Sequence, residues 1–402
     1  MADNTKIEWT DATWNPLAGC SRASEGCRFC YAELQAARII KMDRGRGVEE
    51  GQGRYDGLLA PGGQWNGKIK LASTATLLQP VRWRRGRRVF VNSMSDLFHE
   101  SVADEVIDRI FAVMLACQLF GRQHTFQVLT KRADRMQRYF AARTPGQHLK
   151  AWAKAGDGLV TLDDPDIFFS EYVENQTCHD WDERGNNRND SPFEPWGYTD
   201  KLFPLPNLWL GVSVENQAAA DERLPLLMDS PAAIRWVSAE PLIGAVDLSN
   251  WLEIGSLESQ LGLANPGIDW VVVGGESGPN ARPMLPDWAR SLQVQCKKAA
   301  VAFLFKQWGE HHTLAYRMSD QAPVFRQFDS FQQWVNKAST WVNGGICIAR
   351  DGTLIKDGGD MRRAQEQGLF PVTIMHRVGK RKAGRLLDGI LYDSYPKATT
   401  TL

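Results

Sequence analysis

The chain has 402 residues, 43% of them hydrophobic, and its 47 Lys or Arg balance 47 Asp or Glu. This hydrophobic content supports a substantial core and excludes wholesale disorder, and zero net charge excludes a nucleic-acid affinity based on overall charge. The polar start MADNTKIEW, the absence of a run of about 18 apolar residues, and an odd number of cysteines, seven, are not typical of secreted or membrane proteins. We therefore expect a cytoplasmic protein with no membrane segment.

Short apolar runs alternate with helical stretches along the chain. A first strand is expected at Ile7–Thr10, leading into a loop that contains three cysteines. Cys30–Met42 has helical composition, and another helix is expected from about Ala103 to Gly121, where apolar residues recur at helical spacing. Further strands are expected at residues 89–92, 126–130, 208–214, 234–239, 270–273 and 303–306.

This alternation predicts a parallel α/β architecture, and the continuously apolar runs are typical of strands covered by helices. Because polar residues follow the strands, where a barrel collects its active site, we predict a full or partial TIM-type barrel. The barrel is expected over residues 1–141 and 207–310, with an insertion at 142–206 and a C-terminal extension at 311–402. The insertion is acidic, since residues 157–200 contain twelve Asp or Glu and two Arg.

The loop cysteines, Cys20, Cys27 and Cys30, are spaced C-x6-C-x2-C. Glycine and serine between them allow the loop to fold back so that three thiolates converge. The next cysteine is Cys117 and the first histidine is His99, so no fourth ligand is close in sequence. Structural zinc normally takes four ligands, whereas an iron–sulfur cluster on three cysteines leaves one iron open to a small molecule. A redox pair, a zinc site and unligated thiols remain alternatives.

This loop resembles the cluster loop of radical S-adenosylmethionine (SAM) enzymes, C-x3-C-x-aromatic-C, with Phe29 in the aromatic position and a first gap of six residues instead of three. The sequence pattern W-N-P-x-x-G-C…G-C-x-x-C-Y more closely resembles that of a phage-associated family of unknown function within that superfamily. The segments NSMSDLFHE and VLTKR resemble strand motifs of its photolyase-like branch. The resemblance implies a radical SAM barrel with a [4Fe–4S] cluster on the three cysteines and SAM as cofactor.

Polar residues that follow the predicted strands are candidates for the SAM site. The resemblance implies that acids and glycines at the barrel rim hold the amino group and the adenosine of SAM, and serine suits ribose hydroxyls. Asp96 as a helix cap, Glu240 as a structural carboxylate and an ordinary turn at 274–278 are the structural alternatives. The candidate SAM contacts are Phe29, Tyr31, Ser95, Asp96, Lys131, Ser213, Glu215, Glu240, Gly274, Gly275 and Glu276.

Two basic segments are candidates for nucleic-acid binding. A cluster of arginines beside Trp83 is the kind of surface that engages phosphates, and a solvated charged face is the alternative. The candidate residues are Arg84, Arg85, Arg87 and Arg88 in the first segment and Lys380, Arg381 and Lys382 in the second.

The expected function is a radical SAM enzyme in which a 5′-deoxyadenosyl radical abstracts hydrogen from a substrate. The resemblance implies a nucleic-acid base as substrate, in phage DNA hypermodification or lesion repair, and that base would be flipped out or single-stranded. The expected partners are DNA or a nucleotide and an electron donor such as flavodoxin or ferredoxin. The alternative is a non-catalytic, zinc-bearing protein that binds nucleic acid.

Overall fold

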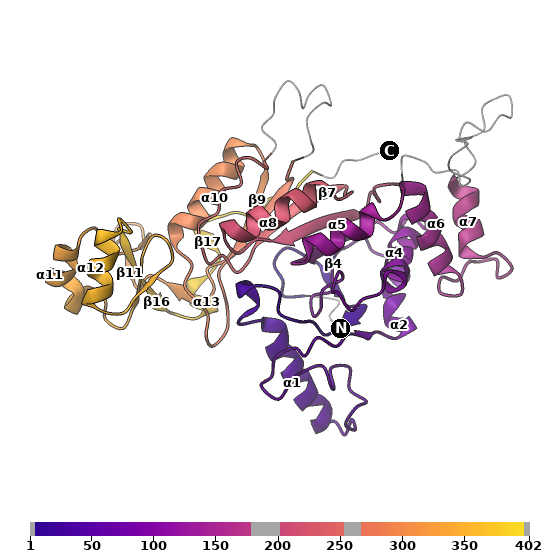
Figure 1. Cartoon of the computed structure of the whole chain (residues 1–402), viewed down its shortest axis with the longest axis horizontal. Coiled ribbons are helices and arrows are strands. Elements are labelled where there is room, and N and C mark those ends of the chain that lie inside the picture. Colours follow the sequence, from indigo (N-terminus) through magenta and orange to yellow (C-terminus); the bar gives the residue numbers. More distant parts are fainter. Residues whose placement is uncertain (1–4, 178–201, 253–266, 398–402) are drawn as a thin grey trace.

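The computed structural model describes residues 5–177, 202–252 and 267–397. Figure 1 shows an elongated molecule with a strand-and-helix body at its centre, a smaller module of sheet and helices at one end, and α7 at the other. No described helix combines the length and apolar character needed to cross a membrane.

Seven parallel strands form the central sheet, in the order β1-β4-β5-β6-β7-β8-β9. The sheet curls into a half-barrel, so the predicted parallel α/β architecture is confirmed in the form of a partial barrel. The strands are β1 (Ala12–Trp14), β4 (Arg88–Val91), β5 (Thr125–Thr130), β6 (Leu208–Ser213), β7 (Ile234–Ala239), β8 (Trp270–Gly274) and β9 (Ala302–Gln307).

The first strand was predicted at the wrong place. Residues 7–10 form a turn instead, and β1 begins only at Ala12. Trp9, which is 2% exposed, packs against Phe90, Trp236 and Trp270, with ring centroids 4.6, 5.1 and 6.2 Å away. The apolar residues of this segment therefore anchor the chain in the concave face of the half-barrel, whose inner core is rich in tryptophan.

Helices cover the convex face of the sheet, and the main hydrophobic core lies between them and the strands. The predicted helix at 103–121 is confirmed as α4 (Asp104–Leu119). The other covering helices are α5 (Ala133–Ala141), α8 (Gln217–Met228) and α10 (Pro286–Lys298). The helical composition at Cys30–Met42 is confirmed as the helix α1 (Tyr31–Gly45). Short elements before β4 are β2 (Leu17–Ala18), η1 (Glu25–Cys27), β3 (Lys70–Leu71), α2 (Thr74–Leu77) and α3 (Gln79–Arg82).

The first half of the insertion packs onto the barrel body. Its helices are α6 (Pro145–Gly156), which starts with a capping box at Thr144, and α7 (Phe169–Thr177). Trp152 of α6 stacks on Phe111 of α4, with ring centroids 4.8 Å apart and an interplanar angle of 14°. The rest of the acidic stretch, residues 178–201, lies outside the described residues.

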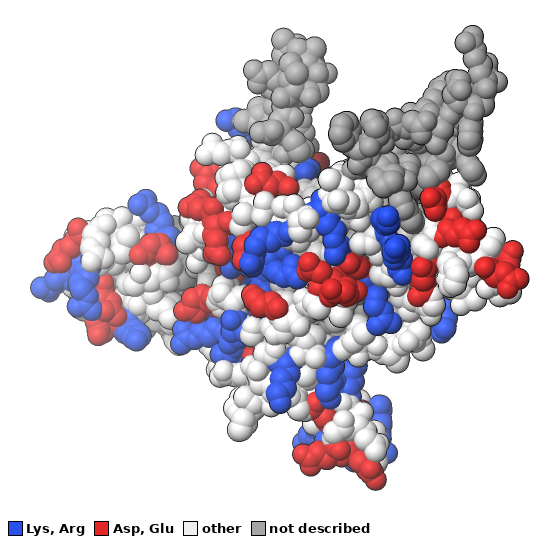
Figure 2. Space-filling view, turned by 45° about the vertical axis from the view of Figure 1, so that its right-hand side comes forward, with Lys and Arg blue, Asp and Glu red and all other residues white. Residues whose placement is uncertain are grey.

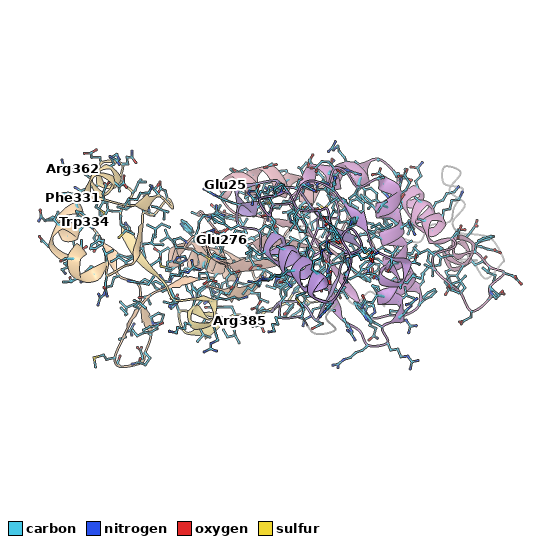
Figure 3. The ribbon with its side chains drawn as sticks, turned by 90° about the horizontal axis from the view of Figure 1, so that it is seen from below. Glu25, Glu276, Phe331, Trp334, Arg362 and Arg385 are labelled. Carbon is cyan, nitrogen blue, oxygen red and sulfur yellow. The ribbon has the colours of Figure 1, made fainter. Side chains whose placement is uncertain are left out.

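The C-terminal extension begins with a module that has its own core. Figure 3 labels Phe331, Trp334 and Arg362 in this module, at one end of the molecule. Its antiparallel sheet contains β10 (His311–His312), β13 (Gln327–Phe328), β14 (Ile346–Ile348), β15 (Leu354–Ile355) and β16 (Val372–Arg377). The module also contains a hairpin, β11 (Ala315–Tyr316) with β12 (Pro323–Val324), and the helices α11 (Phe331–Trp341) and α12 (Gly358–Glu366).

After the module the chain returns to the half-barrel. It passes through α13 (Lys380–Ala383), β17 (Leu386–Leu387) and β18 (Ile390–Leu391). The backbone N–H of Phe305 in β9 then donates to the carbonyl of Tyr392, and the indole of Trp270 donates to the carbonyl of Ser394. Residues 392–395 therefore pack beside the barrel.

Candidate functional site

A cavity of about 370 Å³ lies inside the carboxyl end of the half-barrel. Its walls come from the cysteine loop (residues 20–30), the loops after β4 and β5, the inner ends of β7 and β9, and residues 6–9 with Lys380. The carboxyl ends of parallel strands lie at one end of a barrel, which is where such folds place their sites. Cys20, Cys27 and Cys30 all line this cavity.

The three loop cysteines are partly buried and free of disulfides. Burial raises the pKa of the Cys20 thiol to about 12. Burial also raises the pKa of Cys30, although the backbone N–H groups of Glu33 and Ala32 partly offset it. Within the described ranges, no three His, Cys, Asp or Glu side chains converge closely enough to hold a metal ion. What the structure shows is three thiols around one cavity.

Glu215, at the end of β6, fixes the cysteine loop to the barrel. Its carboxylate is 1% exposed and accepts hydrogen bonds from Ser24 Oγ at 2.6 Å and Arg223 Nη1 at 2.8 Å. Lys131 Nζ lies 3.1 Å from the same carboxylate. Burial alone would raise the pKa of Glu215, but Lys131, Arg223 and Ser24 together lower it to about 2. Glu215 and Lys131 are thus ionised partners of each other.

Glu276 supports the same loop through Arg282. The carboxylate accepts hydrogen bonds from the backbone nitrogen, Nε and Nη2 of Arg282, at 2.8, 2.9 and 2.7 Å. Nη2 also donates to the carbonyl of Glu25 at 3.0 Å, and the guanidinium lies 5.5 Å from the ring centroid of Phe29. Figure 3 labels Glu25 and Glu276 in the central body. Glu276 therefore positions the loop.

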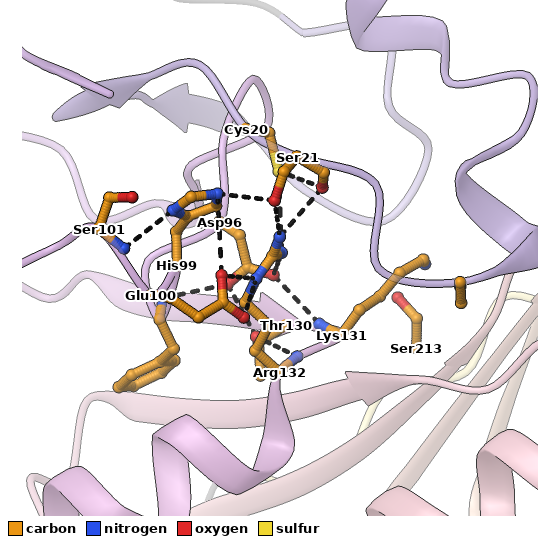
Figure 4. Close-up of polar contacts among 12 residues, drawn as sticks. Cys20, Ser21, Asp96, His99, Glu100, Ser101, Thr130, Lys131, Arg132 and Ser213 are labelled. Atoms are coloured by element: carbon orange, nitrogen blue, oxygen red, sulfur yellow. Dashed lines mark hydrogen bonds and ion pairs between the residues drawn. The ribbon is translucent and has the colours of Figure 1, made fainter. Parts of the chain in front are cut away.

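Asp96, in the loop after β4, joins that loop to the end of β5 (Figure 4). One carboxylate oxygen accepts from Thr130 Oγ1 at 2.7 Å and from the N–H of Phe98 at 3.0 Å. The other accepts from the N–H of Lys131 at 3.2 Å and from Arg132 Nη1 at 3.1 Å. Asp96 lines the cavity, but both oxygens already have two protein donors.

Arg132 is a site residue that we did not single out from the sequence. It is 4% exposed, and its Nε donates to both oxygens of Glu100 at 2.9 Å. Its Nη2 donates to Oγ of Ser21 at 2.8 Å, beside Cys20 (Figure 4). His99 Nε2 lies 2.8 Å from the same hydroxyl, and His99 Nδ1 accepts from the N–H of Ser101 at 3.1 Å. His99 Nε2 is therefore the protonated nitrogen, because Nδ1 acts as the acceptor.

Glu240 and Lys306 form an ion pair in the cavity wall. Lys306 Nζ lies 3.1 Å from one carboxylate oxygen of Glu240 and 3.2 Å from the other. A Cβ atom at Gly274 would collide with this carboxylate, and one at Gly275 would collide with the carbonyl of Trp308. Both glycines are thus explained by close packing within the protein, and Gly274 is not among the residues that line the cavity.

Residues 4–396 match the model of a family described as "Protein of unknown function (DUF5131)". The chain belongs to the DUF5131 family. Neither a search of curated proteins nor a search of solved structures gave a match.

The remaining cofactor candidates of this DUF5131 member also lie near the cavity. Ser213 is 3% exposed and lines it. Ser95 lines it too, and its hydroxyl donates to the carbonyl of Leu17 at 3.2 Å. Tyr31, half-exposed at the start of α1, donates its hydroxyl to the carbonyl of Ser93. Nine of the eleven candidate residues therefore line the cavity. Glu215 does not line it but binds Ser24 of the cysteine loop, and Gly274 packs against Glu240.

The two basic segments of this DUF5131 member lie in different places. Residues 84–88 lead into the amino end of β4, opposite the cavity, and none of them lines it. Arg88 is held by Asp11, with Nη2 2.9 Å from Oδ1, and lies over Tyr395. Only the second segment reaches the cavity, through Lys380. The face seen in Figure 2 intersperses Lys and Arg with Asp and Glu.

Proposed function

We propose that this DUF5131 member is a radical SAM enzyme that holds a [4Fe–4S] cluster through Cys20, Cys27 and Cys30. The observation that carries the proposal is that three free thiols of one loop line a single cavity at the carboxyl end of a half-barrel. Three cysteine ligands leave one iron open for SAM. When bound, the cluster would supply the electron that cleaves SAM into methionine and a 5′-deoxyadenosyl radical, and that radical would take hydrogen from the substrate.

The donor set favours this proposal over a structural zinc site. A structural zinc site normally takes a fourth protein ligand. His99 contacts Ser21, the residue that follows Cys20, but both of its ring nitrogens are engaged and it does not line the cavity. The chemistry of three thiols with an open side therefore fits a cluster better than it fits zinc.

The proposed SAM contacts are the polar groups of the cavity that are not committed to the cysteine loop. Asp96 and Glu276 bind Arg132 and Arg282, so we assign them support of the cavity wall. Ser213 and the Glu240–Lys306 pair face the cavity and are assigned to hold SAM, with the carboxylate accepting from an ammonium and the hydroxyl serving the ribose.

We propose a nucleic-acid base as the substrate and the cytoplasm as the location. The support is the resemblance to phage-associated and photolyase-like radical SAM families, together with Lys6 and Lys380 at the cavity wall. Electrons would come from a donor such as flavodoxin or ferredoxin. A fluorescence-anisotropy titration with single-stranded DNA at low salt tests the substrate class. Binding should weaken as the salt concentration rises. Lys380→Glu should weaken binding more than Arg84→Glu does.

The central test is anaerobic reconstitution with iron and sulfide, followed by an assay for 5′-deoxyadenosine with SAM and dithionite. Replacing any loop cysteine by alanine should abolish iron binding and 5′-deoxyadenosine formation. Matched replacements at the buried Cys117, Cys296 and Cys347 should leave the iron content unchanged, because these thiols lie away from the cavity. One zinc per chain with no iron after anaerobic preparation would overturn the proposal.

A further inference from the structure

The guanidinium of Arg132 lies against the cysteine loop at Cys20. Its Nη1 is 3.8 Å from Cys20 Sγ, a distance at which an N–H group bonds to sulfur. Its Nη2 donates to the carbonyl of Ser21 at 3.0 Å and to Ser21 Oγ. One buried cation thus holds the backbone next to Cys20 and also contacts the sulfur of Cys20.

Arg132 is itself rigidly held. Asp96 and Glu100 accept from two edges of the guanidinium, at 3.1 Å and 2.9 Å. The guanidinium carries its charge throughout, because arginine is not deprotonated in proteins. Across the described parts of the chain, Cys20 is the one loop cysteine whose sulfur has a hydrogen bond from an Arg or Lys nitrogen.

We propose that Arg132 is a positioning residue that fixes Cys20 through Ser21 and raises the reduction potential of the bound cluster, while Asp96 opposes it. This inference rests on the proposed function. Reduction by the titrant adds one electron and no proton, converting [4Fe–4S]²⁺ to [4Fe–4S]¹⁺. A nearby cation and an N–H···S bond stabilise the more negative, reduced form, and a nearby anion stabilises the oxidised form.

The two neighbours of Cys20 therefore predict shifts of opposite sign. Arg132→Met should move the midpoint potential to a more negative value, because a cation and an N–H···S bond are lost. Asp96→Asn should move it to a more positive value, because a carboxylate 3.1 Å from Arg132 loses its charge at nearly constant shape. Glu100→Gln should give a smaller positive shift, since the Glu100 side chain is 61% exposed and screened by water and salt.

The test is a dithionite titration of the reconstituted wild-type protein and the three variants, monitored by electron paramagnetic resonance, with the iron content of each sample measured first. Shifts of opposite sign for Arg132→Met and Asp96→Asn support the inference. Shifts of the same sign, or none, overturn it, because a residue that only stabilises the fold would not produce a sign that follows its charge.

Arg132→Lys serves where Arg132→Met does not retain iron. Arg132→Lys keeps the charge and loses the planar fork, so its midpoint potential should lie close to that of the wild type. A negative shift as large as the positive shift of Asp96→Asn would overturn the assignment of the effect to charge. A wild-type protein that takes up no iron at all would refute the proposed function. An iron-loaded protein whose midpoint potential is unchanged by these substitutions would refute only the role of Arg132.

Discussion

Gly26 lies against Glu215 so closely that a Cβ atom at position 26 would collide with the carboxylate. The contact joins the middle of the cysteine loop to the end of β6, where Glu215 is already bound by Lys131 and Arg223. A buried, doubly paired carboxylate cannot move aside without breaking both ion pairs. The position of the loop is therefore set by the barrel as well as by its own sequence.

Gly26→Ala should displace the cysteine loop. We expect a loss of about 1–3 kcal/mol of stability, as for other overpacked sites, and a larger fractional loss of iron after reconstitution. The checks are thermal unfolding and iron analysis. Gly62→Ala is the matched control, because a Cβ there meets open space; equal behaviour of the two variants would contradict the packing argument.

Glu215→Gln should leave the cation of Arg223 without its charged partner at a site where Arg223 is 3% exposed. Breaking a buried ion pair on one side costs about 3–5 kcal/mol, which urea unfolding at pH 7 measures. Glu222→Gln, an exposed change on α8 beside Arg223, should have little effect.

The stabilisation that Glu215 provides should depend on pH. The pKa of Glu215 is lowered from 4.5 to about 2 in the folded protein, so its stabilising charge is fully present above pH 4.5 and is lost as the pH falls towards 2. The difference in unfolding free energy between wild type and Glu215→Gln should be constant above pH 5 and shrink below pH 4.5. A constant difference down to pH 3 would argue against the ion pairs.

Buried histidines should weaken the fold in mild acid. Burial lowers the pKa of His148, whose Nε2 lies 3.1 Å from the carbonyl of Phe140, and of His124. As the pH falls, the histidines of the unfolded chain are protonated near pH 6.5, whereas those of the folded chain stay neutral. The free energy of unfolding should therefore decrease as the pH falls from 7.5 to 5.5. The slope is at most about 1.4 kcal/mol per pH unit for each histidine. His148→Gln should reduce the measured slope, and an unchanged slope would exclude His148 as a contributor.

The sequence was informative about the sheet because β5 to β9 are nearly continuous apolar runs, and each was placed to within a few residues. It failed at Trp9, where the alternating segment Ile7–Thr10 forms a turn that anchors the inner core, because local pattern does not distinguish a short strand from a buried turn. The cysteines and the polar residues after the strands do gather at one cavity. Their pairing was not predictable, because it depends on the order of the strands in the folded sheet: Glu240 after β7 meets Lys306 of β9 across β8, and Asp96 after β4 meets Arg132 after the neighbouring β5.

Tyr395 should matter for the stability of the barrel. Its ring lies 5.2 Å from Trp270 and 4.0 Å from the guanidinium of Arg88, and its hydroxyl donates to the carbonyl of Glu8 at 3.3 Å. Tyr395→Phe should cost about 0.5–1.5 kcal/mol through the lost hydrogen bond. Tyr395→Ala should cost about 1–3 kcal/mol through lost apolar burial and cation–π contact. Urea unfolding of both variants checks the order.

The bond between Tyr395 and Glu8 also bears on how the protein is made. A ribosome delivers Glu8, Arg88 and Trp270 long before Tyr395, so the surface that Tyr395 covers stays open to solvent while most of the chain is being synthesised. Until then, the tryptophan cluster of the concave face lacks the ring of Tyr395 that packs against it in the folded protein.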